Sequence, residues 1–157
     1  MHARLAQRVA LVAVLLTLLM PTSGAAVAAP SAGSVASGVD VRIYDPRGQS
    51  RWEVRTADVV RSSAYASRRP GGSAALYFRL TKYGALKFHR LTRALAQRGA
   101  RLHRSQPLAL KVDGRVYARP LVDYRAFPDG LDGRSGIQVE GLKLATAQRL
   151  ASEIRRG

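Results

Sequence analysis

The sequence predicts an α+β fold: a small, mostly antiparallel sheet with helices packed on one face. Short stretches alternate apolar and polar residues, as half-buried strands do, while longer stretches repeat apolar residues every three or four positions, as helices do. Asp113-Gly114, between two alternating stretches, is the strongest short signal for a two-residue hairpin turn. We expect the order strand, helix, strand, helix, three strands and a final helix.

The first half of this order rests on three segments. A strand is expected at 39–45, where apolar residues alternate with polar ones. Thr56 is predicted to cap a first helix that runs to about Ser67, since Asp58 would place an acid in its first turn. A second strand is expected at 74–80, before the second helix begins.

The second half contains the hairpin and the last helix. Thr81 can cap the second helix, and Gly99 can end it in a left-handed conformation. Strands at 108–112 and 116–124 flank the Asp-Gly turn, and Pro120 marks an edge or the end of pairing. A loop then leads to a short strand and a final helix, whose apolar residues are Ile137 and Val139, then Ala147, Leu150, Ala151 and Ile154.

The N-terminus has the organisation of a secretory signal peptide. Two arginines precede a predominantly apolar run at 9–20, and the segment ends in Ala26-Val27-Ala28. This run is shorter than the about 20 residues that a membrane-spanning helix needs, which argues against an uncleaved anchor. We therefore expect a secreted, extracytoplasmic protein with cleavage after Ala28, a flexible linker at 29–38 and a single domain at 39–157.

Arginine dominates the charge of the chain. There are 26 basic residues against 10 acidic ones, so the net charge is +16 at pH 7, or +14 without Arg4 and Arg8 of the expected signal peptide. Such an excess attracts polyanions, and export favours anionic wall polymers or lipid headgroups over nucleic acid. A second interpretation stays open, in which an arginine-rich proteome places arginine wherever a surface cation is tolerated.

The predicted second helix sorts its residues onto two sides at 100° per residue. One side is apolar, with Gly84, Phe88, Leu91 and Leu95. The other carries five cations and no acid, with Leu86 among them: Lys82, Lys87, Arg90, Arg93 and Arg98. Such a stripe is ordinarily a solvated face, and a surface for an anionic ligand is the alternative.

No group of residues predicts catalysis or metal binding. The absence of cysteine excludes disulfides, thiolate metal sites and a cysteine nucleophile. His89 and His103 have no second ligand at metal-binding spacing. Trp52 and Phe127 are interpreted as packing or loop-anchoring aromatics, and three aspartates beside glycines as turn residues: Asp113, Asp129 and Asp132. We expect neither an enzyme nor a bound cofactor or metal.

Four stretches in the C-terminal part of the chain carry a family resemblance. They are ALYFRLTKYGALKFHRLT at 75–92, PLALKVDGRVYARP at 107–120, IQVEG at 137–141 and ATAQRLASEIRRG at 145–157. In this order they resemble the head subdomain of the first extracytoplasmic domain of SecD, in the SecDF accessory subunit of the preprotein translocase. The matching residues are interpreted as structural ones: Leu80, Thr81, Gly84, Phe88, Asp113, Gly114, Val116, Pro120 and Gly141.

The resemblance is strongest over 73–157 and has departures. The family's hairpin serine is Ala118 here, and the usual Phe-Thr entry to the last helix is absent. SecD also carries transmembrane helices that couple proton flow to translocation, and no stretch after the expected signal peptide has membrane length. We therefore expect a freestanding head-like module rather than a proton-driven motor.

Two functions stay open at this point. The resemblance implies a non-enzymatic module that binds protein, either an emerging preprotein or translocase components. An exposed edge strand could accept an extended segment through main-chain hydrogen bonds. The alternative is a cationic surface protein that binds anionic wall polymers or lipid headgroups. Salt separates these two, because it screens exposed charge pairs but not strand addition.

Overall fold

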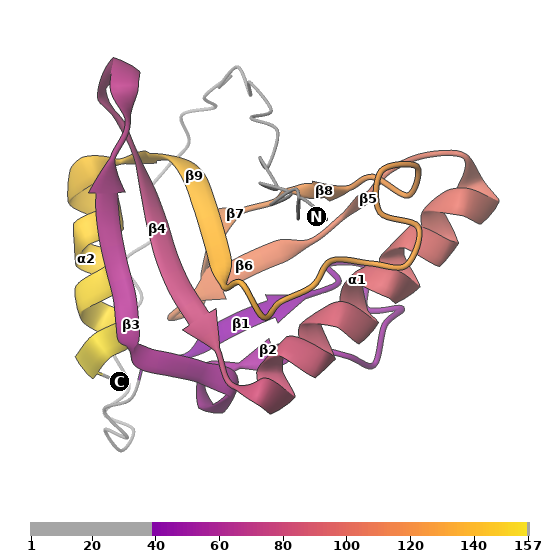
Figure 1. The fold of residues 1–157 in the computed structure, drawn as a ribbon, viewed down its shortest axis with the longest axis horizontal. Coiled ribbons are helices and arrows are strands. Elements are labelled where there is room, and N and C mark those ends of the chain that lie inside the picture. The colour runs from indigo at the N-terminus through magenta and orange to yellow at the C-terminus, as the bar shows by residue number, and fades with distance from the viewer. Residues whose placement is uncertain (1–38, 157) are drawn as a thin grey trace, which may run out of the picture. The chain divides into compact units, whose positions relative to one another are not determined.

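The computed structural model describes residues 39–156 (Figure 1). The expected signal peptide, its cleavage point and the linker lie outside this range. The strands are β1 Val41–Tyr44, β2 Val54–Arg55, β3 Val59–Arg68, β4 Ser73–Leu80, β5 Gln106–Pro107, β6 Ala109–Val112, β7 Arg115–Ala118, β8 Leu121–Val122 and β9 Ile137–Lys143. The helices are α1 Lys82–Leu102 and α2 Leu144–Arg156, with the 3₁₀ turns η1 Thr56–Asp58 and η2 Pro70–Gly72.

The predicted α+β class is confirmed, although the strands of the described range divide among three antiparallel sheets. Their orders are β2-β1-β6-β7, β3-β4-β9 and β5-β8. Helix α2 packs against β3 and β4, while α1 contacts β2, β5 and β8 (Figure 1). The two helices therefore cover different sheets, and the fully buried side chains of β4, α1 and α2 join one core: Leu76, Phe78, Leu91, Leu95, Leu150 and Ile154.

The helix predicted from Thr56 to about Ser67 is wrong. The single 3₁₀ turn η1 ends at Asp58, and β3 follows it directly. The Thr56 hydroxyl does not cap a helix, because it accepts a hydrogen bond from Val41 N at 2.7 Å and donates one to Val39 O at 2.9 Å. β3 pairs with β4, and this pairing outweighs a weak helix-start signal.

Helix α1 begins as predicted but ends later. The Thr81 hydroxyl accepts a hydrogen bond from Gly84 N at 3.0 Å, which is the expected cap. The predicted end at Gly99 is wrong, because the left-handed residue is His103, with a φ of 51°. Gly99 lies inside the helix instead, at a tightly packed position where a Cβ would lie 3.0 Å from the carbonyl oxygen of Arg104.

The predicted hairpin forms between β6 and β7. Asp113 and Gly114 have φ values of 45° and 80°, both positive as this two-residue turn requires. Pro120 lies between β7 and β8, where its carbonyl accepts a hydrogen bond from Leu108 N at 2.8 Å. The strand predicted to return over 116–124 is therefore two short strands that pair in different sheets.

A bulge in β9 precedes the last helix. Leu76 pairs with Val139, whereas Ala74 pairs with Leu142, so β9 contains one residue more than β4 over this stretch. Gly141 takes up the extra residue with a φ of 76°, which glycine adopts without strain. Helix α2 then buries the four residues predicted for it: Ala147, Leu150, Ala151 and Ile154.

Candidate functional site

Within residues 39–156, no three side chains of histidine, aspartate or glutamate are grouped so that they could hold a metal ion. Across the same range, no helix is both long enough and apolar enough to cross a membrane. The candidate sites considered on the described part of the chain are surfaces. Two stand out, the cationic side of α1 and the exposed side of the β3-β4-β9 sheet.

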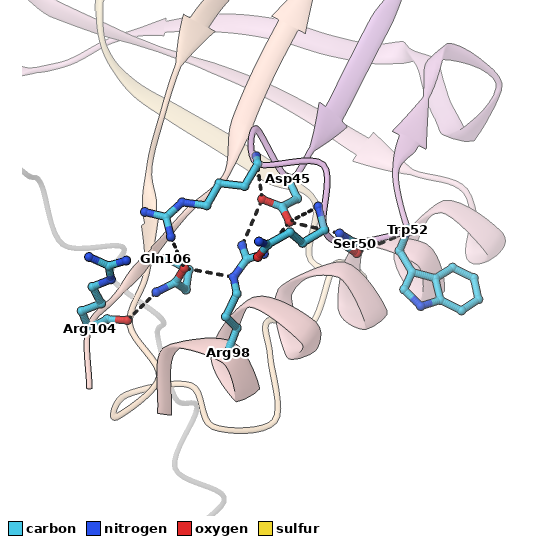
Figure 2. A network of polar contacts seen from close by, with 8 residues as sticks. Asp45, Ser50, Trp52, Arg98, Arg104 and Gln106 are labelled. Carbon is cyan, nitrogen blue, oxygen red and sulfur yellow. Dashed lines mark hydrogen bonds and ion pairs between the residues drawn. The ribbon is translucent and has the colours of Figure 1, made fainter. Parts of the chain in front are cut away.

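Arg98 does not belong to the cationic surface that the sequence predicted. It is only 8% exposed, and its Nη1 and Nη2 lie 2.8 and 3.0 Å from the two carboxylate oxygens of Asp45 (Figure 2). Placing Arg98 on the solvent-facing stripe is therefore wrong. It lies at the margin of the cationic side, where the loop between β1 and β2 brings Asp45 against the helix.

Asp45 organises the loop between β1 and β2. Its carboxylate accepts hydrogen bonds from the backbone N–H groups of Arg47, Gln49 and Ser50 at 3.0, 3.2 and 3.1 Å. Burial raises the pKa of Asp45, but the hydrogen bonds and charge of Arg98 and the backbone hydrogen bonds outweigh it, so this pKa lies below its ordinary value. Asp45 is therefore an ionised, buried anchor for the loop.

The same network holds Trp52 beside α1. Ser50 Oγ accepts a hydrogen bond from Trp52 N at 3.2 Å (Figure 2). On the other side, Arg98 Nε donates to Gln106 Oε1 at 3.0 Å, and Gln106 is fully buried. The loop, α1 and β5 are thus joined through buried polar contacts, which fix the loop where it carries Arg51 and Trp52.

The remaining cations of the predicted stripe differ in whether they already form an ion pair. Lys87 is half-buried, and its Nζ lies 2.9 Å from Oδ2 of the buried Asp58. Lys82, Arg90 and Arg93 are exposed and make no ion pair with any described residue. Only these three therefore remain from the stripe as cations available to a ligand.

Arg90 and Arg93 meet the loop in a groove of about 460 Å³, lined by Arg51, Trp52, Arg90, Arg93, Ala94 and Gln97. The guanidinium carbons of Arg51 and Arg90 lie 5.1 and 4.6 Å from the centroid of the Trp52 ring. Contacts of this kind hold a guanidinium in place while its N–H groups stay available to an oxyanion. With three arginines and no acid in its lining, the groove is suited to an anion.

The second surface surrounds two tyrosines on the β3-β4-β9 sheet. Tyr65 of β3 pairs with Tyr77 of β4, and their rings stack with centroids 4.8 Å apart. Arg69 donates a hydrogen bond to the Tyr77 hydroxyl and forms an ion pair with Glu140 at 3.4 Å. Tyr65 is 53% exposed, and β3 ends its sheet, with no described strand on its outer side.

The residues that carried the family resemblance lie in neither surface. Leu80 and Phe88 are buried in the core, Val116 is half-buried in β7, and Pro120 is exposed. The others form the α1 cap, the contact between α1 and η1, the hairpin turn and the β9 bulge: Thr81, Gly84, Asp113, Gly114 and Gly141. These positions shape the elements, whereas Arg51 and Trp52 were missed as site residues because no motif marks them.

Comparisons with known proteins place this fold beside SecDF. A crystal structure of SecDF in its super-membrane-facing form matches with a TM-score of 0.52 and 21% identity, over 77% of this chain. A structure described as a membrane component SecDF that enhances protein export matches with a TM-score of 0.49 and 19% identity, over 76% of this chain. On the first of these matches, the described residues have a SecD-like fold.

The likeness is one of fold and covers only part of the larger protein. This chain spans 19% of the first SecDF chain and 62% of the second. No protein-family model matches the sequence. No curated protein matches it either.

Proposed function

We propose that the chain is a secreted, non-enzymatic module that binds extended polypeptide in protein translocation, outside the membrane. We further propose that residues 39–156 correspond to the head subdomain of the first extracytoplasmic domain of SecD. The SecD-like fold and the four sequence stretches in the family's order support this assignment. Secretion rests on the basic and apolar pattern of the first 28 residues.

The outer edge of β3 is the main structural support for polypeptide binding. Residues 65–68 pair in unbroken register with 74–77 of β4 on one side only. An extended segment can add to such an edge through main-chain hydrogen bonds, which do not depend on its sequence. The exposed Tyr65, stacked on Tyr77, adds a rigid aromatic contact beside this edge.

Binding of a labelled unfolded secretory polypeptide tests the proposal. The protein begins at Ala29 for this purpose, since the whole described core lies beyond that residue. Fluorescence anisotropy is followed from about 0.05 M to about 0.5 M NaCl. We expect binding that persists at high salt, because strand addition and apolar contacts are not screened.

Two matched tyrosine variants localise this binding. Tyr65→Ser should weaken it by about tenfold, as expected for an aromatic anchor of an interface. Tyr83→Ser removes an equally exposed tyrosine from α1 and should leave polypeptide binding unchanged. Loss of all binding at high salt, or equal effects of the two variants, would contradict the proposal.

A further inference from the structure

The groove at Trp52 is part of a larger face of α1 that polypeptide binding at β3 does not use. Seven of the exposed residues of α1 fall within a sector of roughly 100° around the helix axis, whereas the exposed Leu102 at its C-terminal end lies outside this sector. These seven are Lys82, Tyr83, Leu86, Arg90, Arg93, Gln97 and Arg101. With Arg51 and Trp52 from the neighbouring loop, these residues form what we call the α1 face.

We propose that the α1 face docks the protein onto an anionic phospholipid bilayer, and that Arg51, Arg90 and Arg93 bind lipid phosphate groups in the groove. This proposal goes beyond polypeptide binding and does not depend on it. The two surfaces lie on different elements, the outer edge of β3 and the outward side of α1.

Charge complementarity is the first reason to expect an anionic bilayer at the α1 face. Helix α1 has 21 residues and contains no acid. Two buried carboxylates lie near α1, and each forms an ion pair: Asp45 with Arg98, and Asp58 with Lys87. Neither of them therefore neutralises the exposed cations. The planar guanidinium of arginine matches the oxygens of a phosphate with two parallel hydrogen bonds.

The apolar side chains on the same face favour a bilayer over a soluble polyanion. Leu86 and Tyr83 are 42% and 60% exposed among the cations. The strength of binding at a membrane interface scales with the apolar area that is buried there plus the electrostatic attraction to anionic lipids. Tyrosine and tryptophan are also enriched at this depth, where one end of the ring is apolar and the other wet. A soluble polyanion would gain nothing from these apolar residues.

The α1 face is also built in advance of any ligand. The buried ion pair of Asp45 and Arg98 fixes the loop, and Ser50 fixes the backbone of Trp52. Arg51 and Arg90 then lie over the Trp52 ring, which limits the side-chain entropy that binding would cost. Two of the three arginines in the groove, Arg51 and Arg90, are therefore held near Trp52 before any membrane is bound.

Trp52 allows a direct test, because it is the only tryptophan of the chain. Its emission is followed as vesicles of phosphatidylglycerol, or of phosphatidylcholine, are added to the protein that begins at Ala29. We expect a blue shift and protection from acrylamide with phosphatidylglycerol and no change with phosphatidylcholine. Removing the apolar run at 9–20 ensures that it cannot itself insert into the vesicles.

Two double variants with the same change in net charge distinguish binding through the α1 face from non-specific attraction of a basic protein to anionic vesicles. Arg90→Glu with Arg93→Glu should weaken partitioning onto phosphatidylglycerol by more than about tenfold. Arg115→Glu with Arg119→Glu, at exposed positions on and after β7, should weaken it much less. Equal loss in the two variants would overturn the proposal, and circular dichroism verifies that both remain folded.

The response of Trp52 to soluble anions is compared with its response to vesicles. Glycerol phosphate and polyglutamate are added separately, each at a phosphate or carboxylate concentration matched to the vesicles. We expect neither to shift the Trp52 emission to the blue, and Leu86→Ser to weaken partitioning onto vesicles severalfold. A full response to polyglutamate without one to the vesicles would indicate an acidic polypeptide partner. A full response to glycerol phosphate would indicate a soluble ligand. Either result would overturn the proposal.

Discussion

Arg93 and Arg98 lie five residues apart on α1 and serve unlike purposes. Arg93 is exposed and lines the groove at Trp52, whereas Arg98 is buried and pairs with Asp45. Helical periodicity placed both on the polar side, but it could not separate them, since Asp45 is 53 positions away in the sequence. Part of the arginine excess is therefore structural, and only the exposed part is available to partners.

The Asp45 carboxylate should stabilise the fold as the buried ion-pair partner of Arg98. Asp45→Asn leaves Arg98 buried without its ion-pair partner, so the free energy of unfolding at pH 7 should fall by about 3–5 kcal/mol. Because the folded pKa of Asp45 is lowered, its contribution to stability is present above the unfolded pKa of about 3.9. That contribution is lost as the pH falls through the folded pKa.

The gap in stability between the wild type and Asp45→Asn should therefore narrow below about pH 4. Urea unfolding from pH 7 to about pH 2 measures it. The exposed Asp132→Asn is the control and should show almost no gap at any pH. A gap of constant size across the whole range would show that the Asp45 carboxylate is not the titrating group.

At the scale of elements, the contact between α1 and η1 depends on Gly84. A Cβ at this position would lie 2.4 Å from the carbonyl oxygen of Asp58 and 2.8 Å from its Cβ. Helix propensity alone would make Gly84→Ala stabilising by about 1 kcal/mol. The backbone contact should reverse that sign and cost about 1–3 kcal/mol in the free energy of unfolding. Thermal or urea unfolding decides between the signs, and a stabilised variant would contradict the close contact.

Local signals predicted several elements correctly, whereas β2 and β5 were not predicted. The cap at Thr81, the turn at Asp113-Gly114 and the buried residues of α2 all follow from short patterns. β3 was missed because a weak helix-start signal stood before a strand whose partner, β4, lies across a turn. The end of α1 was misplaced because Gly99 serves packing rather than termination.

The candidate sites were harder to predict than the elements. Three cations of the α1 stripe could be identified from spacing, but Arg51 and Trp52 join them only through the fold. The same holds for Tyr65, since the segment that contains it was predicted as helix, where no sheet edge could exist. Sites made from segments far apart in the sequence leave no spacing pattern to detect.

At the scale of the whole molecule, the described residues offer two surfaces with different physical character. The edge at Tyr65 is suited to main-chain pairing, which salt does not screen. The α1 face is suited to anionic lipid, where attraction weakens as ionic strength rises. A protein that used both would hold an extended polypeptide close to a membrane surface. The two surfaces lie on different elements, so substitutions on one should leave the other intact.

Amide hydrogen exchange of the protein, with and without an unfolded secretory polypeptide, shows whether the outer edge of β3 pairs with an extended chain. We expect slowed exchange at 65–68, because strand addition gives the outward N–H groups of β3 new partners. At high salt, exchange of the α1 amides should be the same with and without the polypeptide. Protection confined to α1, or none anywhere in β3, would contradict polypeptide binding at the sheet edge.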